Sequence, residues 1–240
     1  MRIDKFISEL GAASRKEASK IARSGGVTVN GAPVRDLSAH IDPERDVVTF
    51  QGRELTYKKF VYVMLNKPEG YVSATEDGRY PVVTELAPPE YARLSLFPCG
   101  RLDRDTVGLM LLTNDGALSH ALLSPKRGVE KIYRFKTEAP LPRDAEERLL
   151  AGMTLSDCVC RPARLSADAD RMGGSVTLTE GKYHEVKRMM AALGAPIVYL
   201  ERYAFAGITL DPTLPRGMTR EVSPEELAIL RAAAEKSREE

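Results

Sequence analysis

An abrupt change in character near residue 59 divides the chain. The sequence before it is polar and rich in turn residues, and it closes with Tyr57-Lys58-Lys59. An almost wholly apolar, β-favouring run then extends from Phe60 to Leu65. Such a run is typical of a strand buried on both faces. We therefore place a boundary here and expect a small unit at 1–59, a larger body at 60–234 and a frayed tail at 235–240.

The N-terminal part carries the signals of a helix followed by a hairpin. Ser14-Arg15-Lys16-Glu17 has the spacing of a capping box, and Gly25-Gly26 ends the helical pattern that follows it. Val27-Thr28-Val29 predicts a strand, and Asn30-Gly31 favours the positive φ of a tight hairpin turn. A further strand is predicted from Val47 to Phe50.

Strand and helix patterns alternate along the body. Strands are predicted at 108–113, 132–135, 176–178 and 198–200, and helices at 117–123, 144–150 and 185–193. Ser223-Pro224-Glu225-Glu226 predicts the start of a last helix, since it combines an N-cap, a first-turn proline and a capping glutamate. This mixture of elements predicts an α+β protein.

Charge is unevenly distributed. The total of +1, from 35 basic and 34 acidic residues, by itself argues against a nucleic-acid partner. However, residues 1–40 hold seven basic and four acidic residues, and residues 126–136 hold five basic and one acidic residue with two aromatics. Such segments suit phosphate contact and base stacking. A solvated helix face and a strand with basic residues on its outer side would look the same, so these alternatives stay open.

Several site classes lack their motifs. There is no P-loop, GxGxxG, HExxH or GxSxG sequence, so we expect no nucleotide hydrolysis, no dinucleotide redox chemistry and no serine hydrolase of the common kind. Cys158-Val159-Cys160 lacks the two-residue spacing usual at zinc sites, so no metal site is expected. His40, His120 and His184 are scattered, and surface or packing roles are expected for them. The three cysteines, with no signal peptide or long apolar run, predict a cytoplasmic protein without a membrane partner.

The densest polar motif runs from Gly100 to Gly108. Asp103 and Asp105 alternate with Arg101 and Arg104 between two glycines, directly before the apolar run at 109–112. This pattern predicts a loop with unusual backbone angles that is anchored by a strand. A carboxylate kept ionised there by a nearby cation would be a fixed nucleophile or base. A salt-bridged surface turn remains an alternative, as does metal binding by Asp103, Asp105 and Asp115.

Nearly the whole chain resembles the pseudouridine synthases of the ribosomal small-subunit synthase A family. Arg2-Ile3-Asp4-Lys5-Phe6, Ser14–Ala18 and Val27–Gly31 resemble an S4 RNA-binding domain, and Gly100–Thr106 with Gly108-Leu109 and Leu111–Gly116 matches the family's catalytic motif. The resemblance implies an S4 domain made of an αα-hairpin plus β-strands. It also implies a synthase domain with a mixed, mainly antiparallel sheet and flanking helices.

The resemblance also implies roles for particular residues. Asp103 falls at the catalytic aspartate, Tyr133 at the tyrosine that packs against the target base, and Lys187 at the basic partner of the aspartate. Leu200 falls at an apolar position beneath the pocket. The residues expected to contact RNA are Arg2, Lys5, Arg15, Lys16, Arg23, Arg101, Arg104, Lys126, Arg127, Lys131, Lys182 and Arg188.

The implied function is isomerisation of a specific uridine in 16S ribosomal RNA, at a site of the 516 type, by base flipping and without a cofactor. Ribosomal RNA or a small-subunit assembly intermediate is the expected partner of a monomeric enzyme. Tyr183-His184, Lys187 and Gly207–Asp211 favour this specificity, because large-subunit relatives more often carry Asn-Arg at positions 183–184 and Arg at 187.

Three alternatives remain: a large-subunit (23S) synthase of the same family, a noncatalytic S4-containing ribosome assembly factor and, more remotely, a metal-dependent hydrolase. The chain also departs from the family pattern at Cys99 and at Cys158-Val159-Cys160. Both departures lie outside the implied catalytic set, so they affect expected local packing rather than the reaction.

Overall fold

The computed structural model describes residues 1–55 and 57–235, which form two compact units. The first contains Met1–Val61 together with Pro88–Leu96, and the second contains Tyr62–Ala87 and the described residues from Phe97 onward. Of the tail expected at 235–240, Glu235 ends a helix and the remainder lies outside the described residues. None of the described helices combines the length and apolar character needed to cross a membrane.

The first unit packs two helices on a small antiparallel sheet of order β2-β1-β3-β4. The capping box is confirmed: the Glu17 N–H donates to Ser14 Oγ (3.3 Å), and the Ser14 N–H donates to Glu17 Oε2 (2.9 Å). Asn30 and Gly31 make the predicted turn with φ of 51° and 80°. The elements are α1 (Ile3–Glu9), α2 (Arg15–Arg23), β1 (Val27–Val29), β2 (Ala32–Pro33), β3 (Val48–Phe50) and β4 (Arg53–Leu55).

The second unit is built on a nine-stranded mixed sheet whose main path runs β13-β5-β7-β11-β8-β10-β9. Along this path β7 and β11 pair in parallel and every other pair is antiparallel, so the predicted α+β class with a mainly antiparallel sheet is confirmed. The strands are β5 (Tyr62–Lys67), β6 (Phe97–Pro98), β7 (Val107–Thr113), β8 (Lys131–Thr137), β9 (Arg164–Ala167), β10 (Gly173–Leu178), β11 (Ile197–Phe205), β12 (Ile208–Thr209) and β13 (Thr219–Glu221).

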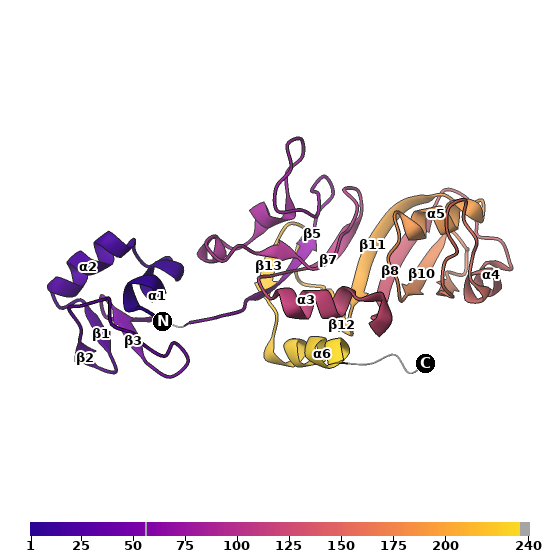
Figure 1. Cartoon of the computed structure of the whole chain (residues 1–240). Helices are drawn as coiled ribbons and strands as arrows, with labels where there is room; N and C mark the ends of the chain where they lie inside the picture. Colours follow the sequence, from indigo (N-terminus) through magenta and orange to yellow (C-terminus); the bar gives the residue numbers. More distant parts are fainter. Residues whose placement is uncertain (56, 236–240) are drawn as a thin grey trace. The chain divides into compact units, whose positions relative to one another are not determined.

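Four α-helices flank this sheet in two groups (Figure 1). Helices α3 (Gly116–Leu123) and α6 (Pro224–Glu235) pack together over a core that includes Met64, Leu109 and Phe205. Helix α4 (Ala145–Ala151) contacts β9, and α5 (Glu185–Ala192) contacts β11. Short 3-10 turns lie at Val83–Leu86, Pro89–Tyr91 and Pro125–Arg127.

The predicted strands differ from the observed ones at their ends, and β5 and β11 show two reasons for this. Strand β5 begins at Tyr62, because Phe60 is 41% exposed and belongs to the connecting segment. Strand β11 extends from Ile197 to Phe205, well beyond the predicted 198–200. The part of β11 after Leu200 contains Glu201 and Arg202, whose charges interrupt the apolar pattern from which the strand was predicted. Tertiary packing nevertheless buries Arg202 and half-buries Glu201. Strands β6 and β12 have two residues each, too few to leave a periodic pattern.

Candidate active site

The loop that carries Asp103 precedes β7, which is an inner strand of the large sheet. In the parallel pair, Val107 lies beside Glu201 and Gly108 beside Arg202 of β11. On the other side of β11, Arg202 lies opposite Tyr133 of β8. The start of β7, the middle of β11 and the start of β8 therefore meet at one place, although they are far apart in the sequence.

Gly108 allows this close approach. Its φ is 103°, a left-handed value that favours glycine. A Cβ atom at this position would collide with the backbone oxygen of Arg202 and lie 2.9 Å from Cγ of Glu201. The second glycine of the motif is thus required by the contact between β7 and β11.

A buried lysine fixes the backbone of the Asp103 loop. Lys67, the last residue of β5, is 0% exposed. Its ammonium donates to the carbonyl oxygens of Pro68 (3.1 Å), Asp103 (3.0 Å), Arg104 (3.2 Å) and Thr106 (2.8 Å). Burial lowers the pKa of Lys67 to about 8, although the nearby carboxylates of Asp105 and Asp103 act in the opposite direction. Lys67 was not among the predicted site residues, and its available signal was a lysine two positions after the apolar run that ends at Leu65.

Ser73 makes a second clamp on the same loop. Its hydroxyl donates to the carbonyl oxygen of Leu102 (2.7 Å) and accepts the Leu102 N–H (2.9 Å). The N–H of Gly70 donates to the carbonyl oxygen of Arg104 (2.8 Å). The segment after β5 therefore holds the loop on both sides of Asp103.

The structure brings Asp103 and Lys187 together. Asp103 Oδ2 lies 2.9 Å from Lys187 Nζ, and Asp105 Oδ1 lies 2.5 Å from the same nitrogen. Burial disfavours the charge on Lys187, but hydrogen bonds to Asp105 and Asp103 outweigh it and raise its pKa. One ammonium is thus shared by two carboxylates, of which the Asp103 side chain is 30% exposed and the Asp105 side chain 61%.

His184 joins the same group. It has φ of 48° at the N-cap of α5, and its Nε2 lies 3.4 Å from Asp103 Oδ1. The ring of Tyr183, which is 75% exposed, stacks on the imidazole at 3.9 Å with an interplanar angle of 16°. A surface or packing role was expected for His184, and its contact with Asp103 was not anticipated. Its position three residues before Lys187 was the available signal.

Tyr133 and Leu200 lie on the neighbouring strands β8 and β11. Tyr133 is 8% exposed, and burial raises its pKa while the nearby Arg202 guanidinium acts to lower it. Arg202 is 1% exposed, and its Nε donates to the carbonyl oxygen of Leu109 (2.8 Å). Leu200 is 5% exposed and lies opposite Phe135 of β8. Arg202 was missed because the sequence pattern ended β11 at Leu200.

The candidate RNA-contacting residues fall into two groups that differ in solvent exposure. The exposed ones are Arg2, Lys5, Arg15, Lys16, Arg23, Arg101, Arg104 and Lys126, whereas Arg127, Lys131, Lys182 and Arg188 are half-buried. Lys182 Nζ lies 2.8 Å from both carboxylate oxygens of Glu180, and Arg188 pairs with Asp157. Burial lowers the pKa of Lys131 to about 8, with the nearby Arg202 acting in the same direction. Lys182 and Arg188 thus have intramolecular ion-pair partners, and Lys131 is largely enclosed.

Asp115 has a structural role. Its Oδ1 accepts the N–H of Leu118 at the start of α3 (3.0 Å), and its Oδ2 accepts the hydroxyl of Tyr62 (2.7 Å). Across residues 1–55 and 57–235, Asp103, Asp105 and Asp115 form no group that could hold a metal ion. Asp115 is therefore engaged at the start of α3 and with Tyr62 rather than in a shared group with Asp103 and Asp105.

The chain matches two family models: RNA pseudouridylate synthase over residues 61–192 and the S4 domain over residues 1–47. It is 42% identical to an uncharacterized RNA pseudouridine synthase of Bacillus subtilis (strain 168), over 96% of this chain and 98% of the relative. It is also 42% identical to the ribosomal small subunit pseudouridine synthase A of Vibrio vulnificus (95% and 98%), and 39% identical to that of Escherichia coli K12 (95% and 99%).

Among solved structures, a crystal structure of a pseudouridylate synthase matches with a TM-score of 0.67 and 36% identity, over 96% of this chain and 99% of the other. The family match, the near-full-length relatives and the shared fold agree with one another. The chain therefore belongs to the RNA pseudouridine synthase family and is an isomerase.

Proposed function

We propose that this chain converts one uridine of 16S ribosomal RNA, at a site of the 516 type, to pseudouridine, and that Asp103 acts on the nucleoside. The relatives named ribosomal small subunit pseudouridine synthase A support this substrate, which would be ribosomal RNA or a small-subunit assembly intermediate. The contact between Asp103 and Lys187, 2.9 Å long, carries the catalytic part of the proposal. It combines a partly exposed carboxylate, a protonated partner and a loop fixed by Lys67.

The reaction breaks the bond between ribose and N1 of uracil and rejoins the ring through C5. Substrate and product are isomers, so the reaction requires no redox or group-transfer cofactor. The base must leave its stack to expose this bond, which costs a few kcal/mol. Contact with Tyr133 would recover part of that cost, because base stacking on an aromatic ring contributes about 1 to 3 kcal/mol. Asp103 would then promote departure of the uracil anion as a nucleophile or a base.

Lys187 balances the negative charge of Asp103 in this scheme. A base above the site excludes water, which strengthens the attraction between these opposite charges. The Lys187 ammonium acts as a point charge, without requiring the bidentate geometry of arginine. Because Asp105 shares the ammonium at 2.5 Å, Lys187 remains in place even when Asp103 turns toward the nucleoside.

In this proposal the first unit binds the RNA substrate. Its match to the S4 domain covers residues 1–47, and we keep the boundary near residue 59 as part of the proposal. Arg15, Lys16 and Arg23 lie on α2 with exposed side chains, where they can reach phosphates.

The test is Asp103→Asn compared with its matched control Asp105→Asn. Both changes remove one carboxylate from Lys187, but Asp103 alone is assigned to the nucleoside. We expect Asp103→Asn to abolish tritium release from RNA labelled at uridine C5 while RNA binding is retained, and Asp105→Asn to keep most of its activity. Undiminished release by Asp103→Asn would refute the assignment.

The specific uridine is tested in cells that lack the protein. Pseudouridine mapping should show the loss of a single site in 16S ribosomal RNA. Loss of a 23S site instead would support the large-subunit alternative, and an unchanged map would support the noncatalytic assembly factor.

A further inference from the structure

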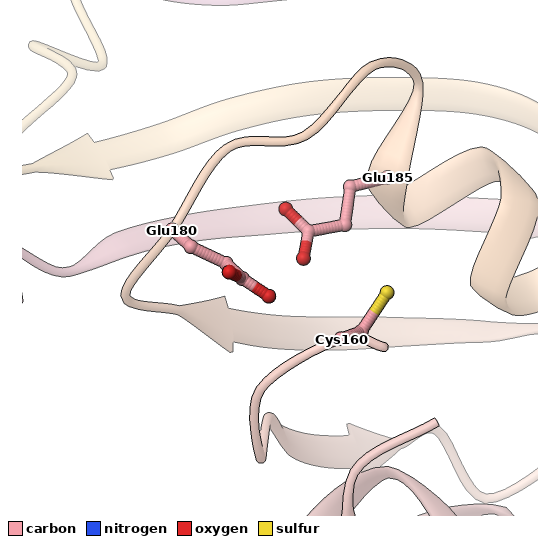
Figure 2. Close-up of side chains that lie close together, drawn as sticks. All are labelled: Cys160, Glu180 and Glu185. Carbon is pink, nitrogen blue, oxygen red and sulfur yellow. The ribbon is translucent and has the colours of Figure 1, made fainter. Parts of the chain in front are cut away.

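A second cluster of reactive side chains lies in the same unit as Asp103. Cys160 precedes β9, Glu180 follows β10, and Glu185 is the first residue of α5. One ligand atom from each of them lies within 4.8 Å of the other two. Figure 2 shows the two carboxylates and the thiol directed toward a common space.

Glu185 contributes an unsatisfied carboxylate oxygen to this cluster. The residue is 4% exposed, and its Oε2 accepts the N–H of Lys182 (2.8 Å). Its Oε1 is buried and has no hydrogen-bond partner in the described part of the chain. A buried, unsatisfied carboxylate oxygen is strongly unfavourable, and the neighbouring Glu180 carboxylate repels it further. Burial and contact with Glu180 raise the pKa of Glu185 to about 7.

The other two groups are held in place. Glu180 Oε1 accepts the N–H of Arg161 (2.7 Å), and both Glu180 oxygens lie 2.8 Å from Lys182 Nζ. Cys160 is 2% exposed, and its N–H donates to the carbonyl oxygen of Met153 (2.7 Å). These contacts fix the Glu180 carboxylate and the backbone at Cys160.

We propose that Cys160, Glu180 and Glu185 bind one divalent cation and that Zn²⁺ is the preferred occupant. A thiolate together with carboxylates suits Zn²⁺, whereas Mg²⁺ and Ca²⁺ take oxygen ligands. Zinc bonds of about 2.3 Å to sulfur and about 2.0 to 2.2 Å to oxygen place tetrahedral ligands roughly 3.4 to 3.7 Å apart. Side-chain rotations that close the cluster by about 1 Å satisfy this geometry, and water fills the fourth position.

The charge of the three ligands also favours Zn²⁺. Binding releases the protons of the Cys160 thiol and of Glu185, so the ligand set becomes threefold negative. The charges of Zn²⁺ and of the Lys182 ammonium, which lies 2.8 Å from Glu180, together neutralise it. A single shared proton would satisfy the two carboxylates but would make no use of the buried thiol.

The site would join the turn between β10 and α5, which holds Glu180 and Glu185, to the segment before β9, which holds Cys160. Glu185 begins the helix that carries Lys187, and Cys160 follows the bridge between Thr154 and Val159. A bound cation would therefore fix the start of α5 against the segment before β9. This is a structural metal site beyond the proposed reaction, to which it adds no chemical step.

The test uses the full chain, stripped with a chelator and then titrated with Co²⁺ and Zn²⁺. We expect one equivalent of Co²⁺ to bind, with a thiolate-to-cobalt absorption band that Zn²⁺ abolishes by displacement. At Zn²⁺ concentrations about 100-fold above the dissociation constant, the melting temperature should rise by about 5 to 10 °C.

Variants assign the ligands. Cys160→Ser should lose the thiolate band, and Glu185→Gln, which preserves the shape of the side chain, should weaken Co²⁺ binding at least tenfold. Cys99→Ser, a buried cysteine in the core beneath α3 and α6, is the matched control and should bind as the unchanged chain does. Circular dichroism establishes that each variant is folded.

Two results would overturn the proposal. One is a lack of Co²⁺ binding by the unchanged chain, which would mean that the cluster holds a shared proton only. The other is equal affinity in Glu185→Gln and the unchanged chain. Asp103→Asn should retain full Co²⁺ binding, so failure of the proposed reaction and failure of the metal site are distinguishable.

Discussion

Two lysines serve the site in different ways. Lys187 contacts the carboxylates of Asp103 and Asp105 through its ammonium and remains charged because they raise its pKa. Lys67 contacts backbone carbonyls and is completely buried, which lowers its pKa. One lysine therefore acts on the charge of Asp103 and the other on its position. Substitutions at the two residues should have different signatures.

Replacing Lys187 with Met should slow the reaction far more than it weakens RNA binding. The change removes the positive charge between two carboxylates, so the charges of Asp103 and Asp105 are no longer balanced when the base covers them. We expect a loss of about 10²-fold or more in the single-turnover rate, with a modest change in Kd. Lys187→Arg, which keeps the charge, should retain more activity. An unchanged single-turnover rate for Lys187→Met would contradict the pairing.

The lowered pKa of Lys67 predicts that the single-turnover rate depends on pH. Its pKa of about 8 in the folded chain means that the ammonium loses a proton as the pH rises through 8, and the loop then loses a hydrogen-bond donor. The single-turnover rate should therefore fall above pH 8, and Lys67→Met should give a lower rate that is flat between about pH 7 and 9. Lys136→Met, at an exposed position on β8, is the control.

The effect of Lys67 on stability has the opposite sign. The unfolded lysine keeps its proton up to its ordinary pKa of 10.5, so between pH 8 and 10.5 the unfolded chain binds more protons than the folded one. The contribution of Lys67 to the free energy of unfolding thus rises with pH while activity declines. A wild-type rate that stays constant from pH 7 to 9 would show that Lys67 does not control the loop.

At the scale of elements, the parallel pair of β7 and β11 determines where the site forms. It interrupts an otherwise antiparallel path and places the loop before β7 beside Arg202 and, one strand further, Tyr133. Helix α5 then adds His184 and Lys187 from the segment just before β11. The site therefore depends on how closely β7 and β11 approach each other.

Gly108→Ala should disrupt that approach. The new methyl group would meet the backbone of Arg202 at a φ of 103°, so the strands must separate. We expect a loss of at least about 1 kcal/mol in stability, or roughly 2 to 4 °C in Tm, with a disproportionate loss of activity. Gly116→Ala, where nothing lies within 4 Å of the added atom, is the control and should leave both measurements nearly unchanged. Equal melting temperatures for the two variants would refute this role.

At the scale of the whole molecule, the distribution of charge matters more than its total. The sequence sums to +1, yet residues 1–40 hold seven basic and four acidic residues, and residues 221–240 hold three basic and six acidic residues. The exposed basic side chains on α2 thus offer a surface for phosphates within a nearly neutral protein.

Replacing Arg15, Lys16 and Arg23 together with Ser should weaken RNA binding and reduce its salt dependence. Each lost phosphate contact lowers the slope of log K against log salt by about 0.7 on single-stranded RNA, so three contacts remove about 2. The rate at saturating RNA should stay the same. The matched control replaces Arg143, Arg148 and Arg164, which are exposed in the second unit. Identical slopes for the two triple variants would exclude α2 from RNA contact.

Local chemistry alone determined much of the fold. Ser14 with Glu17 and Ser223 with Glu226 are capping pairs within four residues, and both helix starts form as predicted. The apolar run before Asn114 likewise forms the central strand β7. These signals can be recognised in the sequence because each interaction is completed by neighbours along the chain.

The family resemblance indicated Asp103 and Lys187. Sequence patterns did not reveal the buried residues that fix the backbone around them. Lys67 contacts the Asp103 loop across 36 positions of sequence, and Arg202 reaches Leu109 across 93. Cys160 likewise meets Glu180 and Glu185 only when the segment before β9 folds against the turn between β10 and α5. The sequence therefore determined the elements and the chemical type of the reactive groups, because those depend on near neighbours. Tertiary structure decided which charges are buried, paired or left facing one another, because these properties depend on contacts between distant segments.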